Sequence, residues 1–432
     1  MIKQHLIIFA LLCATLSPLH AQNNPEFEDF FHNVTLRVDY LRIGCMRHDT
    51  CILKEYVLQN DVWAGSTTQL LDPIDNGAYR ILVKDAASGQ DLYSRCYNSL
   101  FEEYRSTIPG RDKDSIASFE EVMLIPYPKK AIDICLQKRD AKNRFFTAST
   151  FHFNPADEGS VKHRHQKGNT IKLVNNGDMH NKIDVVIVAE GYGKKDAKKM
   201  QEDFKLFTNY LLGVEPFKSR AEDFNVWGVG FLADESGVTD PNADRYVNSA
   251  VGSSYNTFGM DRYLMTTNLF QLHDLLYGTP YDHIIIMANC DTYGGGAIYN
   301  YYAFSAVQKM SQWILPHELG HSIGGLADEY VEDDPNYNRR YENIEPLEPN
   351  ITSLIDFDKK WKSLVPEGTP IPTKPVEGLG KRDNGPIGVY EGAGYMAKGC
   401  YRPCTKCMMR DYAAFCPVCM KRMHEVFDLY VR

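Results

Sequence analysis

The chain has 432 residues, 44% of them hydrophobic and 24% charged, which is enough for two or three domains with sizeable cores. The formal net charge of -9 and the isoelectric point near 5.8 argue against nucleic acid as a partner. Beyond the N-terminus, no apolar run approaches the ~18 residues that a membrane-spanning helix needs, so we expect no transmembrane segment.

Residues 1–21 have the pattern of a secretory signal peptide. A lysine near the N-terminus precedes an apolar run at positions 6–16, and LHA at positions 19–21 offers a cleavage site before Gln22. The two leucines before Cys13 make a poor lipoprotein site, so we expect cleavage without lipidation. The sequence therefore predicts a protein that is secreted, or that lies in the periplasm or at the cell surface.

Residues 22–160 are predicted to form a separate, N-terminal all-β sandwich domain. Stretches such as 33–44 (NVTLRVDYLRIG), 79–85 (YRILVKD) and 144–153 (RFFTASTFHF) alternate between apolar and polar residues, and turn signals separate them. An irregular α+β domain is the alternative. The histidines of this region are scattered and form no catalytic constellation, so we expect a binding or spacer role. Two more histidines, in the polar linker VKHRHQKGN, are expected to be solvated.

Residues 161–432 show a different pattern, in which strands and helices alternate. Buried strands are predicted at 182–192 (KIDVVIVAEGY), 225–233 (NVWGVGFLA) and 283–289 (HIIIMAN), and helices at 196–212 and 263–276. A glycine-rich turn at 293–306 (YGGGAIYNYYAFSA) lacks the lysine and the serine or threonine of a phosphate loop. We expect it to lead into an edge strand, whose outer backbone groups can pair with a further extended segment.

The segment LPHELGHSIGGLADEY, residues 315–330, carries the chemistry. His317 and His321 are four residues apart, so both imidazoles project from one face of a helix and can hold one zinc ion. Glu318 lies beside them and can take a proton from water. Residues 307–315 suit the first half of this helix, but proline interrupts helical hydrogen bonding, so we expect a new helix to begin at Pro316.

A third metal ligand must come from beyond the helix. Ala327, six residues after His321, cannot bind metal. On an unbroken helix Asp328 would lie ~10 Å along the axis from His321. We therefore expect the chain to turn at Gly324 and Gly325 and to bring Asp328 back as the ligand.

Other carboxylates remain as alternatives for the third ligand. Glu329 is the nearest; if Asp328 is the ligand, Glu329 is expected to orient a ligand or to pair at the surface. Further alternatives lie downstream, at Glu342, Glu345 and Glu348.

The remaining chain is polar after Tyr330 and rich in glycine and proline from 366 to 394, and we expect these segments to form walls of the substrate cleft. Residues 417–430 have the apolar stripe of a closing helix. Ten cysteines follow the signal peptide, and in an oxidising compartment disulfides are the default. The spacing of Cys404, Cys407, Cys416 and Cys419 fits either a four-sulfur zinc site or disulfides.

Several of these segments carry a family resemblance. HELGHSIGGLADEY, VYEGAGYMAKGCYRP (389–403) and CMMRDYAAFCPVC (407–419), with VVIVAEGY near the start of the second part, resemble the IgA-peptidase family of bacterial secreted zinc metallopeptidases. The N-terminal third resembles the small domain that often precedes the peptidase domain. The resemblance implies an α+β multidomain chain in which the N-terminal sandwich is followed by a metzincin-like α/β zinc peptidase domain.

The same resemblance implies roles for individual residues. His317 and His321 become zinc ligands, Glu318 the general base, and Met409 the methionine beneath the metal, with Met408 as the alternative. Tyr412 becomes a candidate to stabilise the oxyanion, against the alternative of a packed aromatic. The family name does not establish immunoglobulin as the substrate.

The sequence thus predicts a zinc metalloendopeptidase that acts on extracellular proteins or peptides. One alternative is a non-catalytic surface protein in which zinc is structural and the N-terminal domain binds glycan or protein. Such a protein does not require Glu318, which makes that residue the discriminator. Another alternative is hydrolysis of a non-peptide amide.

Overall fold

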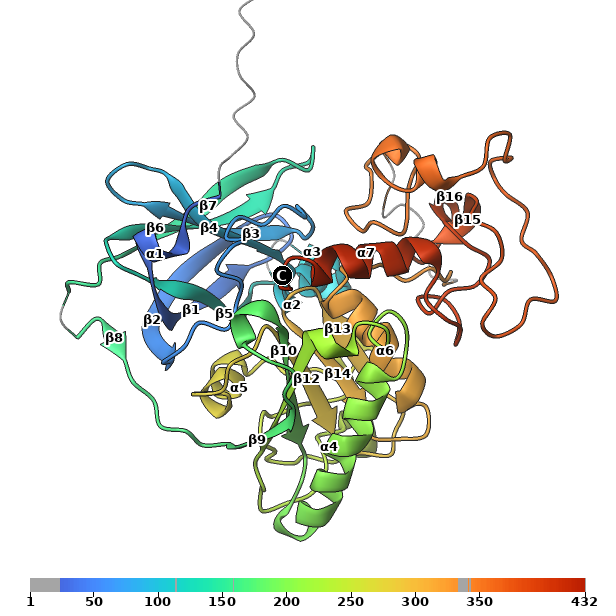
Figure 1. Cartoon of the computed structure of the whole chain (residues 1–432). Coiled ribbons are helices and arrows are strands. Elements are labelled where there is room, and N and C mark those ends of the chain that lie inside the picture. The colour runs from blue at the N-terminus through green and yellow to red at the C-terminus, as the bar shows by residue number, and fades with distance from the viewer. Residues whose placement is uncertain (1–23, 113–114, 158, 333–340, 342, 432) are drawn as a thin grey trace, which may run out of the picture.

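The computed structural model describes residues 24–112, 115–157, 159–332, 341 and 343–431. The predicted signal peptide, its cleavage site before Gln22, and Glu342 lie outside these residues. Figure 1 shows two β-sheets of the N-terminal part, a central part with a larger sheet, and a C-terminal lobe. Within the described ranges, no helix has the length and hydropathy needed to cross a membrane.

The N-terminal part consists of two four-stranded sheets, so the β-rich character predicted for it is confirmed. The strand orders are β5-β1-β2-β8 and β4-β3-β6-β7. Inward-facing residues of both sheets, such as Val38 and Val83, belong to one apolar core. The strands are β1 (Phe31–Gly44), β2 (Asp49–Asn60), β3 (Tyr79–Asp85), β4 (Asp91–Tyr97), β5 (Ala117–Pro128), β6 (Ile132–Arg139), β7 (Phe145–Phe153) and β8 (Val161–Lys162). Three short helices accompany them: α1 (Phe27–Phe30), α2 (Leu100–Ser106) and α3 (Ile108–Arg111).

The central part is built on a mixed sheet of order β13-β14-β12-β10-β11-β9. Strands β10 (Ile183–Glu190), β11 (Phe224–Gly230), β12 (His283–Ala288) and β14 (Tyr302–Ala306) are parallel, and β9 (Asn169–Val174) and β13 (Gly295–Ile298) are antiparallel edges. Every residue of β10 is buried, because this strand lies inside the sheet and both its faces are covered. The three predicted strands are confirmed as β10, β11 and β12.

The helices of the central part agree only partly with the sequence prediction. Helix α4 (Ala197–Leu212) is confirmed, with its apolar stripe buried. The helix predicted over 263–276 is wrong in its first half, since α5 spans only Leu269–Leu275. The reason is that Tyr263 forms a β-bridge with Gly295 on the sheet edge, and this pairing uses backbone groups that a helix would need.

Helix α6 (Ser311–Ser322) corrects a second prediction, because it runs through Pro316 instead of beginning there. The missing proline N–H leaves the carbonyl of Gln312 without its helical partner. Gln312 is exposed, so water can satisfy that carbonyl. Tertiary packing of the buried Ile314, Leu315 and Leu319 then keeps the helix continuous.

The C-terminal lobe contains the hairpin β15 (Tyr390–Ala393) and β16 (Met396–Arg402), followed by helix α7 (Pro417–Phe427). In Figure 1 the lobe (orange to red) and the N-terminal sheets (blue) lie on either side of α7. Helix α7 confirms the closing helix predicted over 417–430. Its Phe427 packs against Phe217 and Phe224 of the central part, with ring centroids 5.3 and 5.1 Å away. The lobe is anchored by this helix.

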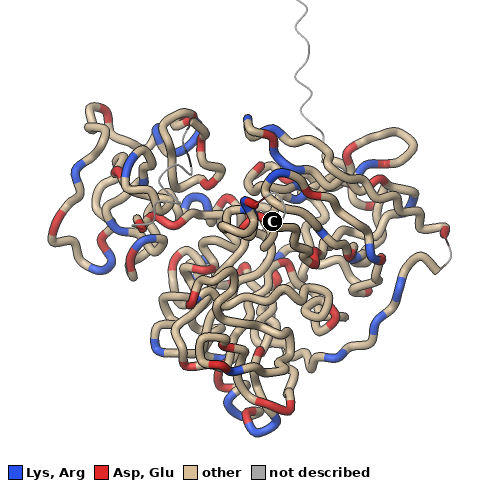
Figure 2. Tube along the Cα trace, turned by 180° about the vertical axis from the view of Figure 1, so that it is seen from behind, with Lys and Arg blue, Asp and Glu red and all other residues tan. Residues whose placement is uncertain are grey.

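The strap that connects the first two parts, residues 159–168, contains several basic residues, among them Lys162, Arg164 and Lys167 (Figure 2). Arg164 binds Glu55 of the N-terminal part at 2.5 Å and Asp274 of the central part at 3.2 Å. His163 and His165 are exposed, as the sequence predicts for a solvated linker. The strap therefore ties the two parts together through charge pairs.

Candidate functional site

Helix α6 presents the two histidines on one face, at the floor of a pocket. The Nε2 atoms of His317 and His321 lie 3.1 Å apart. The other nitrogen of each ring donates to a backbone carbonyl: His317 Nδ1 to Met408 at 2.9 Å and His321 Nδ1 to Leu326 at 2.7 Å. These bonds fix the tautomer in which both Nε2 lone pairs point to the same place.

The chain turns back immediately after this helix, as the paired glycines predict. Gly325 has a φ of +59°, in the left-handed region, and its N–H donates to the carbonyl of His321 at 3.0 Å. The turn carries Asp328 back to the histidines, where its Oδ1 lies 3.1 Å from His317 Nε2 and 3.4 Å from His321 Nε2. The structure thus brings together the three residues that the sequence analysis proposed as ligands.

The three facing atoms suit one metal ion. A tetrahedral zinc with bonds of about 2.0–2.1 Å separates its ligand atoms by roughly 3.3 Å. The observed separations of 3.1 to 3.4 Å match that geometry. Within the described part of the chain, Asp328 Oδ1 is buried without a hydrogen-bond partner. Because three electron-rich atoms face one another, the arrangement favours a metal cation between them or a proton on one of the histidines.

The pKa values of His321 and Asp328 also indicate that this site attracts positive charge. Burial alone would lower the pKa of His321, but the charge of Asp328 outweighs burial and raises it to about 9. Burial opposes ionisation of Asp328, yet the two histidines hold the pKa of its carboxyl far below the ordinary value. The carboxylate of Asp328 therefore stays ionised and attracts positive charge, supplied either by a proton on a histidine or by a metal cation.

Glu318 lies next to this group on α6 but is not one of the three clustered residues. Burial raises the pKa of its carboxyl above the ordinary value, which suits proton transfer near neutral pH. An added Cβ on Gly295 of β13 would come 3.2 Å from Glu318 Oε1. The carboxylate therefore faces the sheet edge at Gly295.

The pocket around these residues has a volume of about 490 Å³. Its walls come from three regions: the N-terminal part around α2 and α3, the edge strand β13, and the chain after the histidine turn. Representative lining residues are Ile108, Arg111, Ala297, Glu348 and Tyr395. The predicted cleft wall is confirmed for the chain after Tyr330, where Glu332, Leu347 and Glu348 line the pocket. It is wrong for residues 366–394 except Gly394, because the other residues of that segment do not line this pocket. The wall from the N-terminal part was not predicted.

Strand β13 is the edge of the sheet, which confirms that part of the sequence prediction. At Gly295 the outer edge is already paired, since its N–H bonds to Arg262 and its carbonyl to Leu264. Two residues further along, Ala297 presents its N–H and C=O in the same outward direction. No backbone partner for Ala297 on that side is seen among the described residues. A strand-like ligand therefore finds free hydrogen-bonding groups at Ala297.

Two supporting residues could not be found from sequence spacing. Tyr395 donates a hydrogen bond from its hydroxyl to Asp328 Oδ2, which leaves Oδ1 for a metal. Asn76, from the N-terminal part, donates from Nδ2 to the carbonyl of Gly325 at 3.1 Å. They lie 67 and 249 residues from their partners, and no local pattern signals either contact.

The other predicted residues lie as follows. Met409 is buried, and its sulfur lies against Gly320 of α6. Tyr412 is 47% exposed, contacts Trp313 and Tyr293, and is not among the residues that line the pocket. Its role in stabilising an oxyanion therefore stays a prediction.

The alternative carboxylates do not join the histidines. Glu345 is paired with Lys360 at 3.0 Å, and Glu348 lines the pocket and accepts from Tyr341. The surface position predicted for Glu329 is wrong, because this residue is fully buried and faces cysteines.

Replacing Gly325 by Ala is expected to destabilise the fold and to weaken metal binding. The left-handed backbone costs an L residue about 1–2 kcal/mol, and here the new Cβ would also lie 2.0 Å from Asn76 Nδ2. Gly378→Ala is the matched control, since its φ is +74° and nothing lies within 4 Å of its added Cβ. Urea unfolding should show a larger loss for Gly325→Ala; equal losses would contradict the role of this contact.

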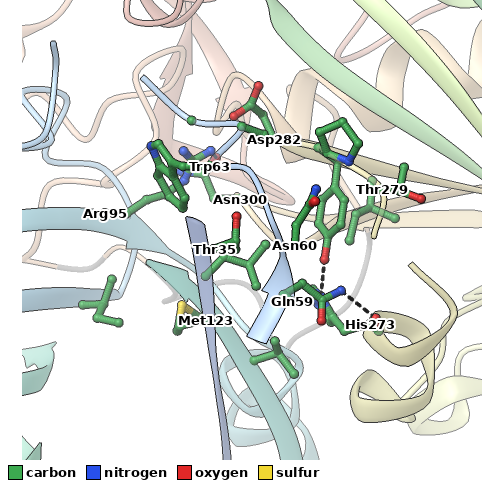
Figure 3. A pocket seen from close by; sticks show the side chains of 18 of the residues that line it. Thr35, Gln59, Asn60, Trp63, Arg95, Met123, His273, Thr279, Asp282 and Asn300 are labelled. Atoms are coloured by element: carbon green, nitrogen blue, oxygen red, sulfur yellow. Dashed lines mark hydrogen bonds between the residues drawn. The ribbon is translucent and has the colours of Figure 1, made fainter. Parts of the chain in front are cut away.

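A second, smaller cavity of about 80 Å³ lies where the N-terminal and central parts meet (Figure 3). There Gln59 donates to the carbonyl of His273 at 2.7 Å, and His273 Nδ1 pairs with the Tyr281 hydroxyl at 2.6 Å. Burial holds the pKa of His273 well below its ordinary value, so this ring is neutral. The hydrogen bond from Gln59 to His273 thus connects the N-terminal and central parts at this cavity.

Comparison with known proteins identifies the family. Residues 171–378 and 377–427 match the family described as IgA Peptidase M64, and residues 26–150 match the one described as Peptidase M64 N-terminus. The comparison with curated proteins gives no match. The matches cover both the histidine site and the N-terminal wall of its pocket. The chain therefore belongs to the M64 family of IgA peptidases, and its first part is the N-terminal domain of that family.

Proposed function

We propose that the protein is a zinc-dependent endopeptidase that cuts extended segments of proteins or peptides. The observation that carries the proposal is the grouping of His317, His321 and Asp328 around one point, with Glu318 beside them in an open pocket. Two imidazoles and one carboxylate are a ligand set that zinc accepts while keeping a position open for substrate. The family assignment supports peptide bonds as the target.

A zinc ion held by these three residues would supply Lewis acidity, which polarises the scissile carbonyl and acidifies a water. The chain's own residues do the rest. Glu318 accepts the proton of the attacking water, and its raised pKa lets it deliver that proton to the leaving amine. Asp328 and Tyr395 hold the ligand geometry through their hydrogen bond.

The substrate is proposed to lie as an added strand beside β13. Ala297 offers an outward N–H and C=O, and Glu318 faces the same strand at Gly295, two residues before Ala297. A bound strand would then pass directly over the histidines. The continuous helix α6, Met409 beneath it and this edge strand support a metzincin-like arrangement, in which Asp328 lies seven residues after His321.

The proposal is tested by incubating the purified protein with a peptide library derived from whole proteomes, with and without a chelator. Internal cleavage that the chelator abolishes and zinc restores is the expected result. Cleavage that persists in chelator, with no metal at the histidines, would reject zinc dependence. Binding of proteins without any cleavage would favour the non-catalytic alternative.

The wall formed by the N-terminal domain is expected to select among substrates. Ile108 of α3 is 75% exposed and lines the pocket, so a bound peptide would cover it. Ile108→Ala should lower kcat/KM by roughly five- to thirtyfold, the equivalent of about 1–2 kcal/mol of apolar contact. Ile116→Ala is the control, since Ile116 is 59% exposed and lies outside the pocket lining. Equal kcat/KM values for the two variants would contradict the proposal that the N-terminal wall contacts the substrate.

We also propose that the protein acts outside the cytoplasm, on the strength of the signal-peptide pattern in residues 1–21. N-terminal sequencing of protein recovered from the producing cell tests this. A mature chain that begins at Gln22 supports export, and an intact Met1 in the cytoplasmic fraction rejects it.

A further inference from the structure

A second cluster of ligating side chains lies behind the histidine site. Cys407, Cys416, Cys419 and Glu329 place one ligand atom each within 4.8 Å of one another, and all four residues are buried. Cys407 Sγ and Cys419 Sγ are 3.7 Å apart, and Cys419 Sγ lies 3.4 Å from Glu329 Oε1. None of these residues belongs to the three that surround the first metal position.

The cluster converges from three places in the chain. Cys416 caps the start of α7, and Cys419 lies in its first turn. The backbone N–H of Cys416 donates to Cys407 Sγ at 3.3 Å, a contact that favours a thiolate at Cys407. Glu329 enters from the turn that follows α6. The three cysteines come from the CxxC motifs that the sequence shows. Glu329, in contrast, lies 78 residues before Cys407.

Glu329 points independently to a cation. Its side chain has no solvent exposure, and Asn350 donates to its Oε1 at 2.9 Å. Its other oxygen, Oε2, has no hydrogen-bond partner among the described residues. A buried carboxylate oxygen without a donor is strongly unfavourable unless a positive charge is close. Arg402 contributes positive charge nearby, but the three thiols that face the carboxylate contribute none, which leaves a place for a cation among them.

We propose that these four residues hold a second metal ion, and that the ion is zinc in a site of three sulfurs and one oxygen. Zinc–sulfur bonds of about 2.3 Å in a tetrahedron separate two sulfurs by roughly 3.8 Å, close to the 3.7 Å observed. A sulfur and an oxygen on the same ion are separated by somewhat less, in agreement with the 3.4 Å contact. Four protein ligands close the coordination shell, so this ion is structural.

This assignment revises both readings of the cysteine motif. Cys404 contacts Cys416 but is not one of the four mutually close residues, so Glu329 takes the position that the spacing assigns to Cys404. Disulfides are contradicted, because all ten described cysteines are free and 3.7 Å far exceeds the about 2.05 Å of a sulfur–sulfur bond.

The second ion would brace the first site through the backbone. Glu329 follows Asp328 directly, and its N–H donates to the carbonyl of Met409 at 2.7 Å. Met408, next to Cys407, accepts the hydrogen bond that orients the ring of His317. Both chain segments that support the histidine site are therefore held by ligands of the second ion.

The test uses the unaltered protein first. Zinc analysis is expected to find two ions per chain, and X-ray absorption at the zinc edge should show sulfur at about 2.3 Å. The first site has only nitrogen and oxygen ligands, so any sulfur signal reports the second site. Because the spectrum averages over both zinc ions, the expected result is three sulfur ligands for every two zinc ions. A spectrum without sulfur would overturn the proposal, and four sulfurs would exchange Glu329 for Cys404.

Variants separate this proposal from the peptidase proposal. Cys419→Ser should reduce the zinc content from two to one and abolish the sulfur signal, whereas Cys135→Ser, at a buried cysteine outside the cluster, should keep both ions. His317→Ala should also leave one ion but keep the sulfur signal intact. Retention of two ions by Cys419→Ser would overturn the second site without touching the first. If Cys419→Ser fails to fold, the spectrum of the unaltered protein still decides.

Discussion

Glu318→Gln is expected to abolish peptide hydrolysis while leaving the fold and the metal content unchanged. The side chain lies outside the group formed by His317, His321 and Asp328, so its loss removes no ligand. A glutamine is nearly isosteric but cannot accept a proton from water. Because positioned proton transfer contributes on the order of 10²–10⁴-fold, kcat should fall by a factor in that range.

The control for this variant lies in the same pocket. Glu348 also lines it, and its carboxylate is paired with the hydroxyl of Tyr341, away from the histidines. Glu348→Gln should therefore keep near wild-type turnover. Both variants are compared by initial rates on one identified peptide and by zinc content. Turnover of Glu318→Gln at the wild-type rate would rule out the peptidase mechanism, and a loss of zinc would show that Glu318 acts on metal binding instead.

The sequence pattern correctly predicted those strands and helices whose apolar residues directly reflect which faces are buried. The apolar run in β10 reads as a buried strand because the strand is covered on both faces, and the stripe of α4 reads as a helix because one side is packed. The four-residue spacing of His317 and His321 likewise fixes their shared face without any tertiary information. The turn at Gly325 was predictable because few other residues adopt its backbone conformation.

Tertiary contacts decided the elements that the pattern missed. Residues 263–268 have helical spacing, but bridges of Tyr263 to Gly295 and of Met265 to Ser254 use backbone groups that a helix would need. Pro316 should interrupt a helix, yet exposure of Gln312 removes much of the cost and the buried face of α6 keeps it intact. In both cases a contact with a distant segment, or with solvent, outweighs the local preference.

The residues of the site likewise fall into a group that the sequence predicts and a group that it does not. Its core residues come from one stretch of 12 residues, from His317 to Asp328, and the sequence was sufficient to propose them. Its supports come from elsewhere: Asn76 and Ile108 from the N-terminal domain, and Tyr395 from the C-terminal lobe. No spacing rule connects residues that far apart. For the same reason the partnership of Glu329 with the cysteines emerged only from the fold.

Asp328→Ala is expected to release the metal from the histidine pair and so to abolish hydrolysis. Asp328 Oδ1 completes the group of three ligand atoms, and without it two imidazoles remain. Removal of a hydrogen-bond partner behind a ligand typically costs about 10–100-fold in metal affinity, which is the loss expected for Tyr395→Phe. Asp328→Ala removes the ligand itself and should lose more. Competition with a chelator, read through zinc content, measures the order of these losses.

Glu329→Ala is the decisive comparison, because the two neighbouring carboxylates face opposite sites. It should release the ion bound to Cys407, Cys416 and Cys419 and abolish the sulfur signal, whereas Asp328→Ala should keep that signal and lose the nitrogen-bound ion. The backbone bond from Glu329 to Met409 survives both changes, so each variant reports one side chain. Loss of the histidine-bound ion in Glu329→Ala but not in Asp328→Ala would make Glu329 the third ligand. Small, equal losses would move that ligand downstream, and the 3.1 Å approach of Asp328 to His317 argues against both outcomes.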